Sequence, residues 1–369
     1  MSLFIIACGG TGGHLTPGIA LAEALLEGGH ECLLLVSRKS VDARLLEKYP
    51  SLCFCRAPGA GFIKTPFGLL RFLFSQAMAV CFALRLVLRR RPAVFVSFGG
   101  FLTFGPTLAC RLGGVPVVLH EANCVPGKAV RLLSRVAARV WLPPGVGLEG
   151  VRSGVVRHAG FPVRREFVQL AREEARRAIG FPGTGKLLLV LGGSQGASPL
   201  NDWVRRHLEA FASAGIHVLC VTGPGKPLGA ALAEQGGHAL VRFIPFCDKM
   251  PEALSAADLV ISRSGAGSIA EFISCVLPSV LVPFPFAADN HQEANARFLK
   301  DLGACVLVAQ GDLEAFTADA LRLLGDDVAL GQLRQNLRAV QGRFAWREMV
   351  VELEAMAAAR AVRGGAAGV

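Results

Sequence analysis

Residues 3–14 read LFIIACGGTGGH, and this stretch decides the fold. Its apolar half, residues 3–8, is typical of a buried strand that stops at a cluster of glycines. A helical pattern follows from Pro17 to about Gly28, and residues 31–36 form the next apolar run. Strand, glycine-rich turn, helix and strand in this order predict a right-handed βαβ unit in a parallel sheet.

The same plan continues along the chain and then restarts. We expect further strands at residues 93–97, 115–120, 187–191, 216–221, 259–262 and 279–282. Three of these runs end at Gly99-Gly100, at Gly192-Gly193 and at Arg263-Ser264-Gly265. The sequence therefore predicts an α/β protein with two Rossmann-like, doubly wound domains. Because such sheets bind ligands at the carboxyl ends of their strands, we expect the turns of both domains to face one cleft.

The composition agrees with two domains in a reducing compartment. The chain has 369 residues, of which 52% are hydrophobic, so each domain can bury a core. The 11 cysteines are scattered and form no Cys-x-x-Cys pair, which argues against a zinc ribbon or a redox motif. The N-terminus lacks a basic segment before its apolar run, so it is interpreted as a strand and not as a signal peptide.

The positive charge lies in the first half of the chain. Residues 1–163 hold 18 Lys and Arg against 7 Asp and Glu, whereas residues 164–369 hold 21 of each. This excess indicates an anionic partner, namely nucleic acid, an acidic membrane surface or a phosphorylated substrate, unless it reflects an arginine-rich composition alone. Nucleic acid is disfavoured because no recognised motif is present and the chain has one Tyr and three Trp for stacking.

Residues 62–91 combine apolar and basic side chains. Arg71 and Arg85 leave 13 uncharged residues between them, which is short of the roughly 20 that cross a bilayer. An amphipathic element lying in an anionic membrane interface fits this pattern, and a buried core helix with a basic end is the alternative. The net positive charge of this half of the chain favours the membrane-interface interpretation over the core helix.

The first glycine turn, residues 9–14, is typical of phosphate binding, because glycines allow close backbone approach and the following helix presents free N–H groups. It is neither a P-loop nor a strict Gly-x-Gly-x-x-Gly motif. Arg38 follows the second strand, which keeps an NADP-dependent dehydrogenase open as an alternative. His14 begins the helix and is either a general base or a structural histidine.

Two turns in the second half have similar chemistry. Residues 192–197 place the hydroxyl of Ser194 at the start of a helix. Residues 263–271 form a Ser/Gly-rich turn and a helix in which Glu271 either accepts from ribose hydroxyls or compensates the helix dipole. The polar run at residues 289–295 is either a solvated helix start or a segment whose amides and carboxylates form hydrogen bonds with sugar hydroxyls.

Taken together, these turns resemble the MurG family, the UDP-N-acetylglucosamine transferases that act on lipid-linked N-acetylmuramoyl-pentapeptide in peptidoglycan synthesis. Single motifs are weak, but the ordered set covers nearly the whole chain. At three positions, Phe101, Gly267 and His291, the chain departs from residues common in that family. The set consists of Gly9 to His14 with Pro17-Gly18, Gly99-Gly100-Phe101, His120-Glu121-x-Asn123, Phe161-Pro162-Val163-Arg164, Gly192 to Ala197, Arg263 to Ala266 with Glu271, and Pro283-Phe284 before Asp289 and Gln292.

The resemblance implies a GT-B fold and a set of site residues. It implies an N-terminal acceptor and membrane domain at residues 1–162, a donor domain at residues 163–345, and a C-terminal helix and tail at residues 346–369. Whether this last segment packs back on the first domain is left open by the sequence. His14 is implied as the base, with Glu121 near it. The implied substrate-binding residues are Thr11, Gly12, Gly13 and Asn123 for the sugar or acceptor pyrophosphate, and Arg164, Ser194, Ile244, Arg263, Ala266, Gly267, Ser268, Ile269, Ala270, Glu271 and Gln292 for the UDP-sugar.

The implied reaction is a single inverting displacement at the anomeric carbon, which forms lipid II from UDP-N-acetylglucosamine and the lipid-linked acceptor. No cofactor or metal is expected, and no Asp-x-Asp motif is present in the sequence. The implied location is the cytoplasmic face of the cell membrane, as a peripheral protein with cell-wall synthesis proteins as partners. A UDP-sugar 2-epimerase and a nucleotide-sugar-binding membrane adaptor remain as alternatives.

Overall fold

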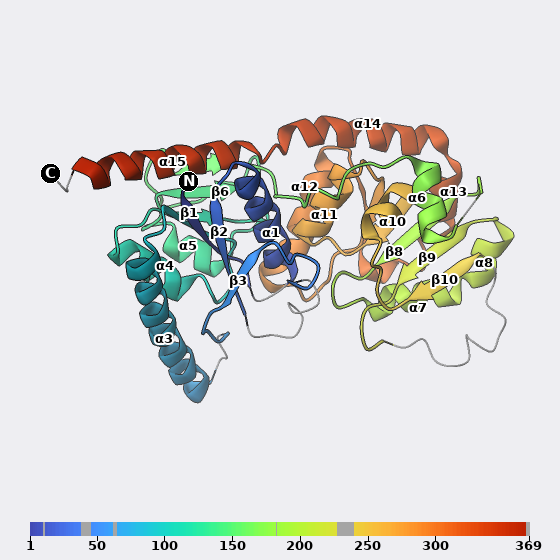
Figure 1. Ribbon diagram of the computed structural model, residues 1–369. Coiled ribbons are helices and arrows are strands. Elements are labelled where there is room, and N and C mark those ends of the chain that lie inside the picture. The colour runs from blue at the N-terminus through green and yellow to red at the C-terminus, as the bar shows by residue number, and fades with distance from the viewer. Residues whose placement is uncertain (10–11, 38–45, 62–64, 182, 227–239, 367–369) are drawn as a thin grey trace. The chain divides into compact units, whose positions relative to one another are not determined.

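A computed structural model describes residues 1–9, 12–37, 46–61, 65–181, 183–226 and 240–366 (Figure 1). The chain forms two compact units, one made of residues 1–165 with 344–369 and the other of residues 166–343. The predicted second domain, residues 163–345, differs from this division at both ends, because residues 163–165 and 344–345 belong to the first unit.

The first unit is built on seven parallel strands in the order β3-β2-β1-β4-β5-β6-β7. This order, in which the chain winds outward from β1 in both directions, is that of a Rossmann-like sheet. The strands are β1 Leu3–Ala7, β2 Glu31–Val36, β3 Cys53–Arg56, β4 Val94–Ser97, β5 Val117–His120, β6 Arg139–Leu142 and β7 Val156–His158.

Helices cover both faces of this sheet, and the alternation of side chains along β1 shows why. Phe4 and Ile6 are buried in one core with residues of α1 and α15, while Ile5 and Ala7 are buried in another with residues of α3, α4 and α5. The helices are α1 Gly12–Glu27, α3 Pro66–Arg90, α4 Phe104–Leu112, α5 Lys128–Leu133 and α15 Glu348–Ala366.

The C-terminal helix α15 is part of the first unit. Met349, Leu353 and Ala357 recur every four residues and are all buried in the core shared with β1 and α1. Glu352 accepts a hydrogen bond from the indole N–H of Trp141 at 2.8 Å. The chain therefore returns to its first unit after completing the second.

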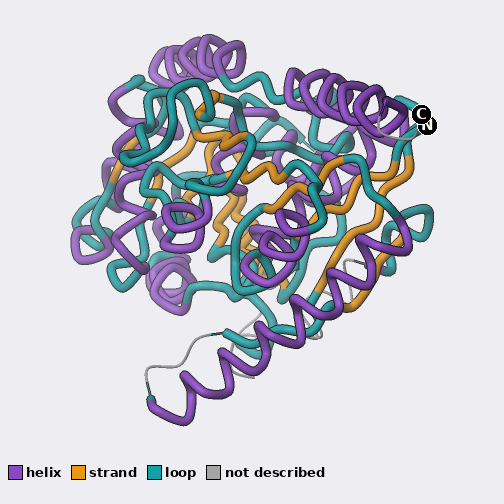
Figure 2. Tube along the Cα trace, turned by 90° about the vertical axis from the view of Figure 1, so that its left-hand side faces the viewer, coloured by secondary structure: helices purple, strands orange, loops and turns teal. Residues whose placement is uncertain are grey.

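Helix α3 has 25 residues and well-formed ends. Thr65 caps its start by accepting from the Gly68 N–H at 3.0 Å, and Pro66 occupies the first turn. At the other end Arg91, at φ 46°, adopts a left-handed conformation that ends the helix. Figures 1 and 2 both show the N-terminal end of α3 projecting beyond the rest of the first unit.

The second unit repeats the plan with six parallel strands in the order β10-β9-β8-β11-β12-β13. These are β8 Leu187–Leu191, β9 His217–Val221, β10 Val241–Ile244, β11 Leu259–Ser262, β12 Ser279–Leu281 and β13 Val306–Leu307. The helices are α6 Arg172–Ile179, α7 Ser198–Arg206, α8 Leu208–Ser213, α10 Met250–Ala256, α11 Ala266–Ser274, α12 His291–Asp301, α13 Thr317–Gly325 and α14 Asp327–Arg343, with short 3-10 helices η1 Ala288–Asn290 and η2 Gln310–Asp312.

The predicted α/β class with two doubly wound units is confirmed. The strands predicted at residues 31–36, 187–191 and 259–262 have those bounds in the structure. Five strands were not predicted, namely β3, β6, β7, β10 and β13. Four of them are edge strands, and β6 lies next to the edge strand β7. The cleft shared by the two units stays a prediction.

Candidate functional site

The first glycine turn follows β1 at the carboxyl edge of the first sheet. Gly9 lies so close to the backbone of Val36 and Ser37 that a Cβ atom there would overlap with it. Helix α1 begins at Gly12, and Gly13 is exposed in its first turn. The predicted ligand residue Thr11 lies outside the described residues. The start of α1 thus brings free backbone N–H groups to this edge, which suits an anionic ligand.

The side chain of His14 lies against the turn that follows β4. A Cβ atom added to Gly99 would lie 3.6 Å from His14 Nε2, and one added to Gly100 would lie 3.2 Å from Nδ1. Both glycines have positive φ, 94° and 77°, a conformation that other residues rarely adopt. The turn after β4 therefore forms a side-chain-free surface against which the half-buried imidazole rests.

The turn under His14 is held from two directions. The hydroxyl of Ser97 donates to that of Thr103 at 2.8 Å and accepts from the Gly99 N–H at 3.3 Å. From α3, the buried amide of Gln76 donates to Phe101 O at 3.2 Å and accepts from Gly105 N at 3.1 Å. Sequence reasoning missed Gln76, because its partners lie 25 and 29 residues away.

Glu121 uses both carboxylate oxygens to hold the loop that follows β5. Oε1 accepts from the backbone N–H of Asn123 at 2.9 Å and from its Nδ2 at 3.0 Å, and Oε2 accepts from the Gly127 N–H at 2.7 Å. The residue is 7% exposed. This arrangement fixes Asn123, and it differs from that of a carboxylate that reaches out to a substrate.

His120 is a buried and neutral histidine. Its Nε2 donates to Gly160 O at 3.4 Å, and its ring packs between Phe98 and Phe161. Burial lowers the pKa of His120 to about 4. His120 therefore joins the end of β5 to the segment near Gly160 and is no candidate for a base that works near neutral pH.

In the second unit, the turns after β8 and β9 interlock through glycines. Gly196 and Gly223 have φ 67° and 92°, and a Cβ atom on either would overlap with the backbone of the other turn. Lys226 donates to Gly196 O at 2.9 Å. Ser194 is exposed at the tip of the first of these turns, in front of α7.

Arg263 points into the second unit. Its guanidinium donates to Val282 O at 3.1 Å, to Pro283 O at 3.0 Å and to Gln310 Oε1 at 2.5 Å. The residue is 6% exposed, and burial lowers its pKa. The side chain predicted to bind the donor instead joins the carboxyl ends of β11 and β12 to η2, so its contribution to a site is to shape the turn.

The helix that carries most of the predicted donor residues, α11, starts directly after this turn. It begins at Ala266, and its N-cap residue is Gly265, which has no side chain to cap the N–H groups of the first turn. Ala266, Gly267, Ser268 and Glu271 are half-buried, whereas Ile269 and Ala270 are buried. Ile269 and Ala270 therefore face the core, and the predicted residues that remain near solvent are those at the start of the helix and Glu271.

Helix α12 is bonded to the same turn. Ser264 Oγ donates to Gln292 O at 2.8 Å, Asn295 Nδ2 donates to Ser264 O at 3.2 Å, and Gln292 Oε1 accepts from Phe284 N at 3.0 Å. Two successive left-handed residues, Asp289 and Asn290, precede the helix. The structure thus brings Gln292 next to the start of α11, as the motif order implied.

Two further predicted donor residues lie elsewhere. Ile244 ends β10, and its carbonyl accepts from Thr222 N at 2.8 Å, which places it beside the turn after β9. Arg164 belongs to the first unit, where its guanidinium donates to the hydroxyl of Tyr49 at 3.2 Å. Within the second unit, Ser194, Ile244, the start of α11 and Gln292 all lie at the carboxyl edge of the sheet.

A buried carboxylate that sequence reasoning missed organises the opposite edge of the second sheet. Asp258 is 1% exposed, and its Oδ2 accepts from Arg172 at 2.6 Å, from Arg176 at 3.2 Å and from Leu187 N at 2.8 Å. Arg334 Nη2 lies 3.9 Å from its Oδ1. This cluster joins α6 and α14 to the starts of β8 and β11. It is structural, because it lies at the amino ends of the strands.

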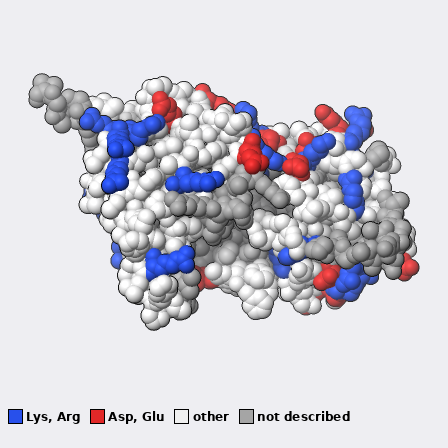
Figure 3. All heavy atoms as spheres, turned by 60° about the horizontal axis from the view of Figure 1, so that its bottom comes forward, with Lys and Arg blue, Asp and Glu red and all other residues white. Residues whose placement is uncertain are grey.

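Helix α3 exposes large apolar side chains and buries small ones. Phe67, Leu70 and Phe74 are 78%, 66% and 70% exposed, whereas Ala79 and Ala83 are buried. Among the described helices, it is the one whose length and composition would allow it to cross a bilayer. Figure 3 shows mainly uncharged atoms over this helix, with Lys and Arg side chains among them. The alternative of a core helix is disfavoured by this exposure.

Within the described residues, no group of three His, Cys, Asp or Glu side chains lies together in a way that could hold a metal ion. The expectation of a reaction without metal or cofactor stays a prediction.

Comparison with known proteins agrees with this geometry. Residues 4–142 match the glycosyltransferase family 28 N-terminal domain, and residues 187–329 match the glycosyltransferase family 28 C-terminal domain. The chain is 49% identical over 359 residues, 96% of this chain and 95% of the relative, to the UDP-N-acetylglucosamine–N-acetylmuramyl-(pentapeptide) pyrophosphoryl-undecaprenol N-acetylglucosamine transferase of Opitutus terrae. It is 37% identical to the protein of that name from Prochlorococcus marinus, with 91% and 92% coverage.

Solved structures of glycosyltransferases also match the chain over nearly its whole length. The crystal structure of Acinetobacter baumannii MurG matches with a TM-score of 0.69 and 25% identity, over 96% of this chain and 98% of that chain. The calicheamicin glycosyltransferase CalG4 matches with a TM-score of 0.69 over 96% and 98% of the two chains, and at 15% identity it shows the shared fold alone.

Proposed function

Starting from the premise that the chain belongs to the MurG family of glycosyltransferases, we propose the reaction that its residues carry out. The protein transfers N-acetylglucosamine from UDP-N-acetylglucosamine to the C4 hydroxyl of undecaprenyl-pyrophosphoryl N-acetylmuramoyl-pentapeptide, which forms lipid II. The observation that carries this conclusion is 49% identity over 96% of the chain to a transferase of that name. The dehydrogenase, epimerase and adaptor alternatives have no comparable support.

The second unit binds the donor in this proposal. The N–H groups at the start of α11, which follow Gly265, and the turn with Ser194 suit the diphosphate, because helix N-termini stabilise negative charge. Glu271 suits the ribose hydroxyls, and Ile244 lines the uracil side. Gln292 is fixed beside them by its bond to Phe284 N. Arg263 supports the turn without touching the donor.

The first unit binds the acceptor and supplies the base. His14 takes the proton of the C4 hydroxyl as the oxygen attacks the anomeric carbon of the donor, and the bond to UDP breaks on the opposite face. One displacement converts the α-linked donor into a β-linked product. The charge that develops on UDP is stabilised by the donor-binding N–H groups. Gly12 and Gly13 face the acceptor pyrophosphate at the start of α1.

Glu121 acts as a positioning residue in this scheme. Its oxygens are engaged by Asn123 and Gly127, so it holds Asn123 in one orientation toward the acceptor. A base role would require the carboxylate to give up these hydrogen bonds, each of which is worth about 1.5–3 kcal/mol when one partner is charged.

Helix α3 attaches the protein to an anionic membrane surface at the cytoplasmic face, as a peripheral protein. The support is the exposed apolar face of α3 together with Arg71, Arg85, Arg89 and Arg90, all exposed on the same helix. Apolar side chains enter the interface while basic ones contact anionic headgroups. A lipid-linked acceptor resides in the same surface. Partners among cell-wall synthesis proteins, and roles in cell shape and division, stay predictions.

The decisive experiment measures release of UDP from UDP-N-acetylglucosamine by the full-length protein. UDP release that requires a lipid-pyrophosphoryl-muramoyl acceptor supports the proposal. Equal release with and without acceptor, or interconversion of the donor sugar with no transfer, contradicts it.

A further inference from the structure

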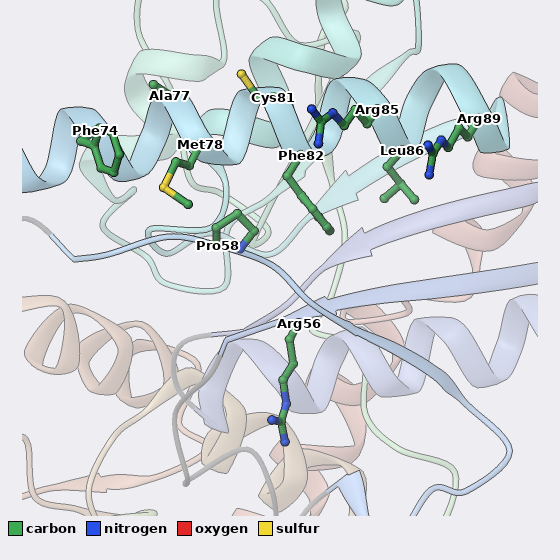
Figure 4. A pocket seen from close by; sticks show the side chains of 10 residues that line it. All are labelled: Arg56, Pro58, Phe74, Ala77, Met78, Cys81, Phe82, Arg85, Leu86 and Arg89. Carbon is green, nitrogen blue, oxygen red and sulfur yellow. The ribbon is translucent and has the colours of Figure 1, made fainter.

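Among the buried side chains of helix α3, that of Gln76 is polar, and it is 5% exposed. The next two residues, Ala77 and Met78, line a groove of about 690 Å³ between α3 and Pro58, and Gln76 is not among its lining residues (Figure 4). A buried amide costs free energy unless its donors and its acceptor form hydrogen bonds. Its presence in a largely apolar helix therefore points to specific partners on the buried side of α3.

Gln76 binds both ends of the segment that leads from the turn after β4 into helix α4. Its Nε2 donates to Phe101 O at 3.2 Å, and its Oε1 accepts from Gly105 N at 3.1 Å. Gly105 lies in the first turn of α4, where backbone N–H groups have no partner within the helix. The hydroxyl of the N-cap residue, Thr103, is bonded to Ser97 instead. Gln76 therefore caps α4 from a different helix.

The two helices meet directly beside this amide. A Cβ atom added to Gly105 would lie 2.6 Å from Ala79 Cβ and 3.1 Å from Val80 N, so the backbone of α4 rests on α3 with no side chain between them. Ala79 follows Gln76 by three residues, which places both on one face of the helix. The start of α4 is therefore fixed on α3, and Gln76 fixes the carbonyl of Phe101 relative to the same helix.

The glycines that contact the imidazole of His14 directly precede Phe101. Gly99 and Gly100 have positive φ and no side chains, so this short stretch has wide conformational freedom unless both of its ends are held. At one end, Ser97 accepts from the Gly99 N–H at 3.3 Å. At the other end, the amide from α3 holds Phe101 O. The surface under the imidazole is therefore fixed by hydrogen bonds on both sides, one of which comes from α3.

We propose that Gln76 is a positioning residue for the base, because its two hydrogen bonds hold Gly99 and Gly100 in the conformation that orients the imidazole of His14. The inference rests on the proposed role of His14 in sugar transfer. As a buried side chain engaged with backbone groups, Gln76 acts through the turn and not by contact with a substrate. Loss of its bonds should therefore slow the chemical step and leave donor binding, which is assigned to the second unit, unchanged.

The test compares Gln76→Met with Ser75→Ala in the full-length protein. Met is similar in length to Gln but lacks its amide, so both bonds to the turn are lost. Ser75 is the preceding residue of α3 and accepts from Ala60 N at 3.2 Å, so Ser75→Ala removes a bond between the same helix and a different segment. The assay uses an acceptor whose lipid is short enough to leave it soluble in water, so that attachment to a membrane does not enter the rate.

Gln76→Met should lower kcat by about tenfold to a hundredfold, which is the effect of a small displacement of a catalytic group. Its affinity for UDP, measured by calorimetry, should equal that of the wild type. Ser75→Ala should leave both quantities unchanged. Circular dichroism checks that the variants are folded. If Gln76→Met does not fold, Gln76→Asn takes its place with the same expectations, because its shorter side chain cannot reach both backbone partners.

A second measurement needs no turnover. The ring signals of His14 are recorded by NMR in protein labelled at histidine and are assigned by their loss in His14→Ala. They should shift in Gln76→Met and stay in place in Ser75→Ala. Unchanged kcat or unchanged His14 signals in the folded Gln76 variant, or an equal loss of kcat in Ser75→Ala, overturns the proposal. A wild-type protein that transfers no sugar, with His14 signals that shift in Gln76→Met alone, contradicts the proposed function and supports the positioning role.

Discussion

The backbone N–H and the side-chain amide of Asn123 both donate to a single oxygen of Glu121, at 2.9 and 3.0 Å. The other oxygen of Glu121 receives the Gly127 N–H at 2.7 Å. One buried carboxylate thus determines the shape of the loop after β5 and the orientation of its amide. This geometry supports the proposed roles of the two residues, in which His14 is the base and Glu121 positions Asn123.

Glu121→Gln should lower kcat with the lipid-linked acceptor by about tenfold to a hundredfold, because one accepting carboxylate oxygen is replaced by an amide NH2 group that donates. If Glu121 only positions Asn123, the pH profile of kcat/KM should keep its acidic limb in this variant. Loss of that limb would instead identify Glu121 as the titrating base. Glu149→Gln, at an exposed site in the same unit, is the matched control and should leave kcat unchanged.

His14→Ala should reduce kcat by about a hundredfold to ten-thousandfold, the range typical of general base catalysis. The affinity for UDP, measured by calorimetry, should stay nearly the same, because His14 belongs to the acceptor side of the proposed reaction. The exposed His158 of the same unit, changed to Ala, serves as control. Undiminished turnover in the His14 variant would remove it from the role of base.

Gly100→Ala tests the contact between the imidazole and the turn after β4. The new Cβ atom would lie 3.2 Å from His14 Nδ1, on a residue with φ 77°. Gly114→Ala is the matched control, since Gly114 has φ 64° and no atom within 4 Å of a Cβ. Both should lose about 1–2 kcal/mol of stability from the left-handed conformation, and only Gly100→Ala should also lose turnover. Equal kcat values for the two folded variants would show that this contact does not orient His14.

His120 should make the first unit less stable in acid. Burial lowers its pKa in the folded chain from 6.5 to about 4. Between these values the unfolded chain binds a proton that the folded chain excludes, so stability is constant above pH 6.5 and falls as the pH drops toward 4. The full effect is about 3 kcal/mol as an upper limit. The free energy of unfolding, measured with urea at several pH values, should vary less with pH for His120→Gln than for the wild type. For His158→Gln its pH dependence should equal that of the wild type.

Asp258→Asn should destabilise the second unit by about 3–5 kcal/mol, because it leaves the buried Arg176 without its counter-charge. Asp202→Asn removes an exposed ion pair with Arg205 and should change stability by less than about 1 kcal/mol. Thermal unfolding of both variants provides the comparison. A small effect at Asp258 would mean that water or rearranged carbonyls replace the carboxylate.

Local sequence determined much of the architecture. The apolar run of β1, the glycines after it and the periodicity of α1 predicted the first βαβ unit, because strand and helix periods and the steric demands of a turn depend on neighbouring residues. The strand bounds of β2, β8 and β11 followed from the same signals. Short edge strands such as β13, with two residues, gave no comparable pattern.

Tertiary structure alone decided what the polar side chains do. The sequence predicted that Arg263 binds the donor. In the structure its guanidinium is buried and donates to backbone carbonyls that lie 19 and 20 residues away. The contact of His14 with Gly100, the bond of Gln76 to Phe101 and the groove between α3 and Pro58 also join separate segments. Neighbours in sequence determine the local backbone, whereas the partner of a buried polar group is whichever group the packing of distant elements places within hydrogen-bonding distance.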